Sequence, residues 1–258
     1  MSPTAAATKS EAEDAALLGF ALGIADDFEL LADLHDREPS QALVAALKDE
    51  EGLEGGLAIV LRSVRSRAAL AAVADAVRAV PTPVDQRVLD DLAAAYADVY
   101  FRHSYRASPA ESVWLTEDGL EQQAPMFRIR AWYRRHHLRV TDPANRPDDH
   151  IVLQLRFLAH AASHAKSAAD LAEVAQFLDE HLLLWIDRFA DRLAETGAPA
   201  WFAALAEVTA SYLAEVRDHL TAITGRERAA PDPEAGMGCG SSGREVEGPY
   251  VPGVAPSW

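Results

Sequence analysis

The chain has little of what several protein classes require. Its 258 residues contain a single cysteine, Cys239, so no disulfide can form within the chain. Asp and Glu number 40 against 24 Lys and Arg, and the formal net charge of −16 lacks the basic surplus of a nucleic-acid or anionic-membrane binder. No uncharged stretch reaches the ~18 residues of a membrane span, and residues 1–14 lack the basic start and apolar core of a secretory signal. We therefore expect a cytoplasmic protein.

Sequence patterns typical of common enzymes are also missing. The chain contains no phosphate-binding loop, no nucleophile elbow, no CxxC pair and no dinucleotide fingerprint. These absences favour a binding protein over an enzyme, and we expect no bound cofactor.

The pattern that is present is helical almost throughout. In 15–34 the apolar residues recur every three or four positions, and no run of alternating β-branched residues suggests a strand. Asp85 is placed to cap the helix that follows it, and Pro125 predicts a kink or a restart inside 117–136. The longer helices are expected over 15–34, 57–80, 117–136, 148–165, 168–196 and 201–223.

We predict an all-α fold made of a single helical-bundle domain of about nine to ten helices over residues 15–224. Residues 1–14 are expected to be flexible, and the polar segment at about 137–147 is expected to form a hinge loop between amino- and carboxy-terminal helical halves. Residues 225–258 are rich in Gly, Pro and Ser and predict a disordered tail, either a linker or an arm that docks.

Two irregular segments interrupt this helical pattern, and function concentrates in such segments. The first runs Ser108-Pro109-Ala110-Glu111-Ser112-Val113-Trp114, and the second runs Pro147-Asp148-Asp149-His150-Ile151. Both have a structural alternative. Asp148 and Asp149 are residues that cap helix N-termini and favour their positive dipole end, and Trp114 is of a type often found in cores.

His160 and His164 lie four residues apart, on one face of an expected helix, and form the best candidate metal pair. Dinuclear helical bundles use Glu-x-x-His motifs, and this chain has none. A helical metal-binding protein or enzyme that uses His160 and His164 is the alternative hypothesis.

The order of three motifs resembles the TorD/DmsD family of redox-enzyme maturation chaperones. The family pattern is an E-S-V-aromatic loop, a hinge, a P-x-D-H-I helix start and a helix similar to F-L-x-E-H-L-x-x-W. This chain has Glu111 to Trp114, Pro147 to Ile151, and Phe177-Leu178-Asp179-Glu180-His181-Leu182 with Trp185. Gln154 departs from the pattern, because many members have a glutamate there.

The resemblance implies a chaperone that binds the twin-arginine signal peptide and the immature catalytic subunit of a molybdenum-cofactor oxidoreductase of the dimethyl-sulfoxide-reductase type. Such chaperones assist cofactor insertion and hold back export, and they occur as monomers or domain-swapped dimers. Carboxylates recognise guanidinium groups, and aromatic rings stack on them. The implied signal-peptide-binding residues are Glu111, Ser112, Trp114, Pro147, Asp148, Asp149 and His150, and Trp132 or Tyr133 is a further candidate for stacking on arginine.

In the first turn of a helix, His150 lies near the positive end of the helix dipole, which disfavours its protonated form. We expect it to be a neutral hydrogen-bonding imidazole.

Overall fold

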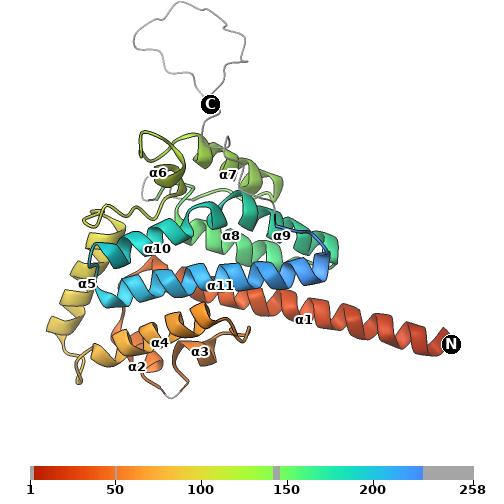
Figure 1. The fold of residues 1–258 in the computed structure, drawn as a ribbon, viewed down its shortest axis with the longest axis horizontal. Coiled ribbons are helices and arrows are strands. Elements are labelled where there is room, and N and C mark those ends of the chain that lie inside the picture. The colour runs from red at the N-terminus through yellow and green to blue at the C-terminus, as the bar shows by residue number, and fades with distance from the viewer. Residues whose placement is uncertain (1–2, 50, 142–145, 229–258) are drawn as a thin grey trace, which may run out of the picture.

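The computed structural model describes residues 3–49, 51–141 and 146–228, and it is a helical bundle (Figure 1). Within these residues there is no strand, and one isolated antiparallel bridge joins Ala110 to His150. The predicted all-α class is confirmed. The elements in chain order are α1 (Pro3–Asp36), α2 (Gln41–Leu47), α3 (Gly52–Gly56), α4 (Val64–Ala79), α5 (Gln86–Tyr100), α6 (Glu111–Leu115), α7 (Ala124–Arg135), α8 (Ile151–Ser163), α9 (Ala168–Glu180), the 3₁₀ turn η1 (Leu182–Leu184), α10 (Ile186–Glu195) and α11 (Ala200–Thr224).

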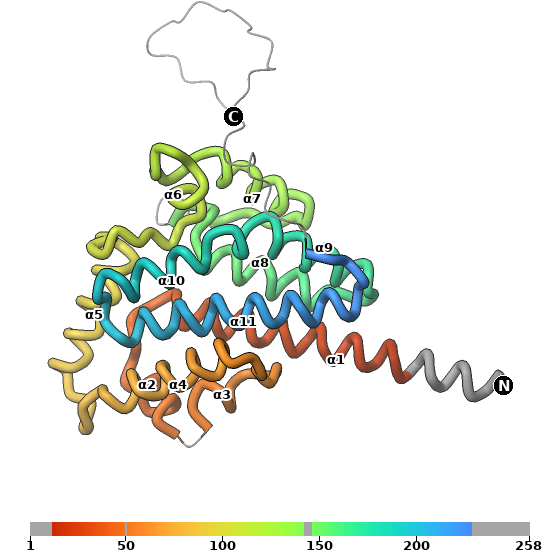
Figure 2. Tube along the Cα trace, viewed as in Figure 1, coloured from red at the N-terminus to blue at the C-terminus, as the bar shows by residue number. Residues whose placement is uncertain are grey.

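Helices α1 and α11 cross the middle of the bundle. Helix α1 packs along α8, whereas α11 packs on α4, α9 and α10. Helices α2, α3 and α4 cover one end of the molecule, and α6 and α7 lie at the opposite end (Figure 2). The core between them is aliphatic and aromatic, with Phe28, Trp185 and Tyr212 among its largest fully buried side chains. None of the described helices carries a stretch that is long and apolar enough to cross a bilayer.

Capping side chains, proline and glycine mark where several helices begin or end. The Asp85 carboxylate accepts the Val88 N–H at 3.0 Å, as the sequence predicts for a cap. Pro125 lies in the first turn of α7, so it starts this helix and does not kink it. Gly197 follows α10 with φ 69°, a left-handed conformation that glycine adopts without strain.

The structure corrects several predicted boundaries, among them the start of the helix expected over 57–80, which lies at Val64. Helix α1 begins at Pro3 and not at residue 15, so residues 3–14 are helical; they are rich in alanine, the best helix former. The helix expected over 168–196 breaks at His181 (φ −131°, ψ −95°) into α9, η1 and α10. Helix α8 begins at Ile151 and not at Asp148. Part of the expected hinge, 142–145, and most of the expected tail, 229–258, lie outside the described residues.

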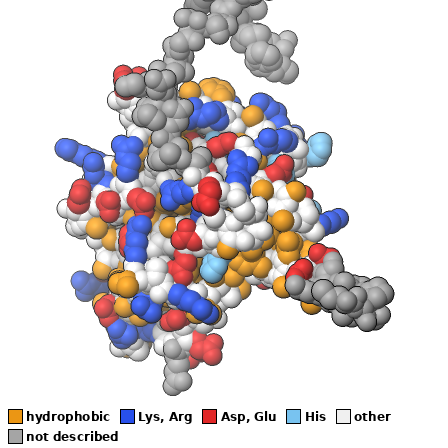
Figure 3. Space-filling model, turned by 45° about the vertical axis from the view of Figure 1, so that its right-hand side comes forward, with side chains coloured by type: hydrophobic (Ala, Val, Ile, Leu, Met, Phe, Trp, Pro, Cys, Tyr) orange, Lys and Arg blue, Asp and Glu red, His pale blue; other side chains and the backbone are white. Residues whose placement is uncertain are grey.

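An apolar surface remains on α1 after the bundle has formed. Leu18 and Leu22, one turn apart, are 41% and 55% exposed. Hydrophobic side chains gather where the amino-terminal part of α1 leaves the bundle (Figure 3).

Candidate functional site

The first two motif segments, far apart in the chain, join each other through their backbones. The bridge between Ala110 and His150 is flanked by two hydrogen bonds, from Glu111 N–H to the Asp149 carbonyl (3.1 Å) and from Ile151 N–H to the Pro109 carbonyl (2.8 Å). The loop before α6 is thereby fixed to the start of α8.

Asp149 caps a helix, but not the helix that it precedes. Its Oδ2 accepts the backbone N–H of Ser112 (2.7 Å) and the Ser112 hydroxyl (2.5 Å), so it satisfies the first turn of α6. The side chain is buried, and burial raises the pKa of its carboxyl above the usual range. Gln154 donates to the Asp149 carbonyl at 2.8 Å. Among the described residues, Asp149 Oδ1 and Gln154 Oε1 have no partner.

The third motif completes the same cluster. His181 Nδ1 lies 3.0 and 3.2 Å from the two carboxylate oxygens of Glu111, and neither side chain has appreciable contact with solvent. His181 is the residue at which α9 ends. This histidine belongs to the third motif, but no local feature of the sequence indicates its contact with Glu111. We call the group formed by these segments the acid–histidine cluster; its members are Glu111, Ser112, Asp148, Asp149, His150 and His181.

Asp148 is the acid of the cluster that borders a cavity. Its carboxylate accepts from Arg130 Nη2 at 2.8 Å, and its carbonyl accepts the Tyr133 hydroxyl at 2.9 Å. A cavity of 250 Å³ adjoins it, and Tyr133 and Arg130 are part of the cavity wall. Pro147 precedes it in the turn and accepts the His150 N–H at 3.0 Å.

His150 is the N-cap of α8, and its ring is buried. Nδ1 accepts the Val152 N–H at 3.2 Å, which requires an unprotonated nitrogen. Burial lowers the pKa of His150 well below 6.5, which is the direction expected for a neutral imidazole. Capping by Asp148 or Asp149 at this helix, the structural alternative, is wrong because His150 occupies the cap.

Each of the two tryptophans near the cluster already has an arginine of this chain over its ring. Trp114 is buried and donates to the Ser108 carbonyl at 2.8 Å, and the Arg188 guanidinium lies 5.5 Å from its ring centroid. The Arg135 guanidinium lies 3.6 Å from the ring centroid of Trp132. Both geometries are those of cation–π contacts. Each ring therefore accepts a guanidinium from within the molecule.

The structure brings the predicted residues together but does not leave them open. Glu111 and Asp149 are 0% exposed, whereas the recognition of guanidinium groups expected from the sequence needs carboxylates that a peptide can reach. In this conformation their oxygens bind Ser112 and His181. Asp148 alone among the three acids borders one of the described cavities.

Comparison with known proteins agrees with the motifs. A family model described as nitrate reductase delta subunit matches residues 65–191, which include all three motifs. The chaperone protein TorD of Vibrio cholerae serotype O1 (strain ATCC 39541) is 30% identical over 131 residues, 48% of this chain and 59% of the relative. The chain belongs to the TorD family.

Other relatives give the same result. The chaperone protein TorD of Vibrio vulnificus (strain YJ016) is 30% identical over 113 residues, 41% of this chain and 53% of the relative. That of Shewanella loihica is 28% identical over 131 residues, 48% and 60% of the two chains. The chain thus spans less than two thirds of the length of these TorD proteins, which are named as chaperones and not as enzymes.

The candidate metal pair lies at the end of α8. The ring centroids of His160 and His164 are 4.2 Å apart, and His164 Nδ1 lies 2.8 Å from the His160 carbonyl oxygen. Across the described ranges, no group of three or more His, Cys, Asp or Glu side chains is arranged to hold a metal ion.

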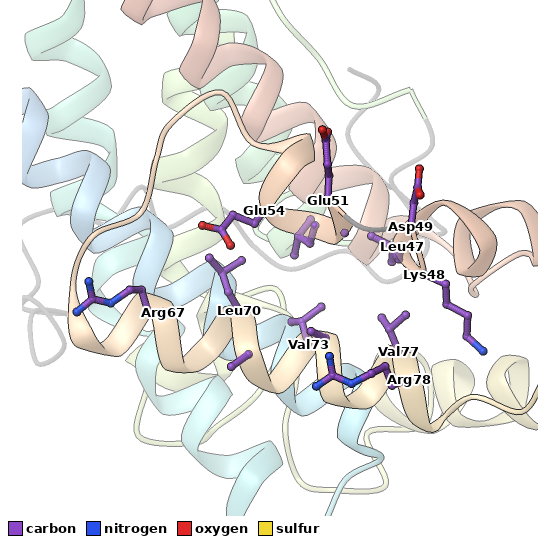
Figure 4. Close-up of a pocket in the computed structure, with 14 residues that line it drawn as sticks. Leu47, Lys48, Asp49, Glu51, Glu54, Arg67, Leu70, Val73, Val77 and Arg78 are labelled. Carbon is purple, nitrogen blue, oxygen red and sulfur yellow. The ribbon is translucent and has the colours of Figure 1, made fainter.

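A second cavity lies at the far end of this TorD-family bundle, between α2–α3 and α4. It measures 520 Å³, and Figure 4 shows Leu70, Val73 and Val77 of α4 directed towards it. Glu51 and Glu54 stand on the α3 side, while Arg67 and Arg78 stand on the α4 side. The mixed charge gives no preference for a partner of one sign.

Proposed function

We propose that this protein is a cytoplasmic chaperone in the maturation of a redox enzyme. Its client is the immature catalytic subunit of a molybdenum-cofactor oxidoreductase of the dimethyl-sulfoxide-reductase type, whose twin-arginine signal peptide it binds while cofactor insertion proceeds and export is held back. Membership in the TorD family supports this proposal. The observation that carries it is the acid–histidine cluster, in which Glu111, Asp149 and His181, from three distant motifs, form one hydrogen-bonded unit.

The signal peptide has two arginines followed by an apolar stretch. Asp148 is the first acid that such a peptide meets, because it borders a cavity whose apolar lining is Tyr133, Leu138 and Val140. Arg130, Arg134 and Arg139 also line this cavity. A guanidinium that replaces Arg130 on Asp148 gains a charge-assisted hydrogen bond beside apolar side chains. Glu111 and Asp149 become available to a second arginine only when α6 separates from the start of α8.

The alternative function, a metal-binding protein or enzyme that uses His160 and His164, has less support. The described residues offer this pair no third ligand group, and structural zinc sites use about four ligands. Elemental analysis distinguishes the two functions, because bound metal that disappears in the His160→Ala variant favours the alternative.

Calorimetry with a synthetic twin-arginine leader tests the proposed function. We expect a Kd of about 1 μM or tighter, and much weaker binding when both arginines are replaced by lysine, which cannot form the guanidinium fork. Asp148→Asn should weaken binding, whereas Asp191→Asn, an exposed acid on α10, is the matched control. The proposal fails if neither the leader nor the precursor that carries it binds the wild-type protein.

The oligomeric state stays a prediction. A hinge at about 137–147 allows the carboxy-terminal helices to pack on a second copy, because a swapped copy makes the same contacts. Size-exclusion chromatography that gives one monomer peak at every concentration would argue against swapping.

A further inference from the structure

Helix α7 and the residues after it form a basic segment in an acidic protein. Residues 124–141 contain five arginines and two histidines but no Asp or Glu, although the whole chain carries a formal charge of −16. Helix α7 lies at the upper end of the molecule in Figure 1, and Figure 3 shows Lys and Arg side chains at this end as well as elsewhere on the face. This local excess of positive charge has no use in the recognition of a cationic leader.

Among these arginines, Arg128, Arg134 and Arg139 are exposed, and the last two line the cavities beside α7. Arg134 and Arg139 are exposed, and within the described ranges neither has a carboxylate partner. Their neighbours differ: Arg130 binds Asp148, and Arg135 lies over Trp132. Because an arginine without a local partner keeps all five N–H donors free, Arg134 and Arg139 can each bind a carboxylate in bidentate geometry.

An apolar groove runs beside these two arginines. Two neighbouring cavities of 250 and 300 Å³ share Tyr133, Leu138, Arg139 and Val140 as lining residues. Arg134 lines the first cavity, and the second extends between α7 and α8 to Leu153 and Phe157. The groove therefore offers space for apolar side chains with guanidinium groups along it. We call this surface, with Arg134 and Arg139, the arginine groove.

We propose that the arginine groove binds an acidic segment of a partner protein, with carboxylates on Arg134 and Arg139 and apolar side chains between Leu138 and Phe157. The groove includes the cavity that Asp148 borders, so an acidic segment and a leader bound at Asp148 would compete for it. The proposal goes beyond leader binding and does not require it. Charge complementarity supports it, because Arg134 and Arg139 attract carboxylates and have no carboxylate partner among the described residues.

Size and charge favour a peptide over a larger polyanion. Screening limits a short acidic segment to charges within about 8 Å at physiological salt, so it is attracted by the local arginines. A nucleic acid or an anionic membrane extends past the groove and meets the rest of a chain whose formal charge is −16.

Fluorescence anisotropy with a labelled peptide of alternating Glu and Leu tests this inference. We expect saturable binding that weakens as salt rises, and loss when every Glu is replaced by Gln. The double variant Arg134→Glu/Arg139→Glu should reduce affinity by about tenfold or more, since each repulsive charge in an interface is costly. The double variant Arg67→Glu/Arg87→Glu is the control, because it changes net charge equally with two exposed arginines on α4 and α5, and it should change affinity by less than about twofold.

Three results would overturn the inference. One is an absence of peptide binding to the wild type, and another is equal loss in the two double variants. The third is equal binding of a single-stranded oligonucleotide or of anionic vesicles through Arg134 and Arg139, because the groove then selects any polyanion. The proposed function is assessed separately with the twin-arginine leader, which should bind Arg134→Glu/Arg139→Glu at least as tightly as the wild type.

Discussion

The Glu111 carboxylate contacts Nδ1 of His181 across 70 positions of sequence, and both side chains are buried. A buried polar pair of this kind depends on its two members equally. If either side chain is removed, the other stays buried away from water and has lost its hydrogen-bond partner, which destabilises the fold. The contact also joins α6 to the end of α9, so it links the first and third motifs of the family pattern.

His181→Ala should therefore lower the free energy of unfolding by about 3 kcal/mol. The reason is that Glu111 then remains buried without its partner. Urea denaturation followed by circular dichroism measures the loss. Arg78→Ala is the control, because its ion pair with Asp75 is exposed and should contribute less than about 1 kcal/mol. A loss in His181→Ala no larger than that of the control contradicts the prediction.

Arg217 and Asp179 form a second buried ion pair, in bidentate geometry. Nε and Nη2 of Arg217 each donate to one Asp179 oxygen at 2.8 Å, and the side chains are 1% and 4% exposed. Arg217→Lys keeps the charge but cannot form the fork, so we expect a loss of about 2 kcal/mol in urea denaturation. Arg192→Lys, in an exposed pair with Glu195, should be close to neutral. Equal stability of Arg217→Lys and the wild type would show that the fork contributes nothing.

Stability should fall as the pH is lowered below 6.5, in part because of His35. Burial lowers the pKa of His35 to about 3. The neutral imidazole forms hydrogen bonds with the hydroxyls of Tyr100 and Thr209 (2.9 Å). Between pH 6.5 and 3 the unfolded chain therefore binds a proton that the folded chain does not. The free energy of unfolding is lost at up to about 1.4 kcal/mol per pH unit in this window.

His35→Gln removes this proton and should flatten the dependence between pH 6.5 and 5 by about that slope. Denaturation series at several pH values for both proteins make the comparison. His150, whose pKa is also lowered, keeps a residual slope of the same sign in the variant. Identical slopes for variant and wild type would mean that His35 does not contribute.

If the leader binds at Asp148, Arg130 competes with it. Arg130 already donates to the Asp148 carboxylate at 2.8 Å, so Arg130→Ala should tighten leader binding by about fivefold, equivalent to ~1 kcal/mol. Arg87→Ala, at an exposed site on α5, is the control in the same calorimetric titration. Weaker binding in Arg130→Ala would indicate that the arginine supports the leader site and does not compete for it.

The sequence predicts the positions of the helices better than their breaks. Apolar periodicity and turn residues locate most helices, and Asp85 and Pro125 act at the positions expected for them. The break at His181 is not predictable locally, because Leu178, Leu182 and Trp185 continue a helical spacing with no Gly or Pro between them. Its cause is tertiary: the histidine ring turns towards Glu111.

The motifs indicate which segments lie together, but they do not predict how exposed their side chains are. The motifs select Glu111, Asp149 and His150 correctly as neighbours, and the structure joins their segments. Whether an acid is exposed depends on partners elsewhere in the chain, such as Ser112 for Asp149 and Arg130 for Asp148. No local pattern specifies those pairings, and none indicates that Asp149 caps a helix 37 positions before it.

The bridge between Ala110 and His150 has a consequence for the kinetics of leader capture. A ligand that needs Glu111 or Asp149 must wait until the backbone hydrogen bonds on either side of this bridge have opened. In stopped-flow mixing, the observed rate should then level off at high peptide concentration, at the rate of spontaneous opening. A peptide that binds only at Asp148 does not require this opening step, so its observed binding rate should keep rising linearly with peptide concentration.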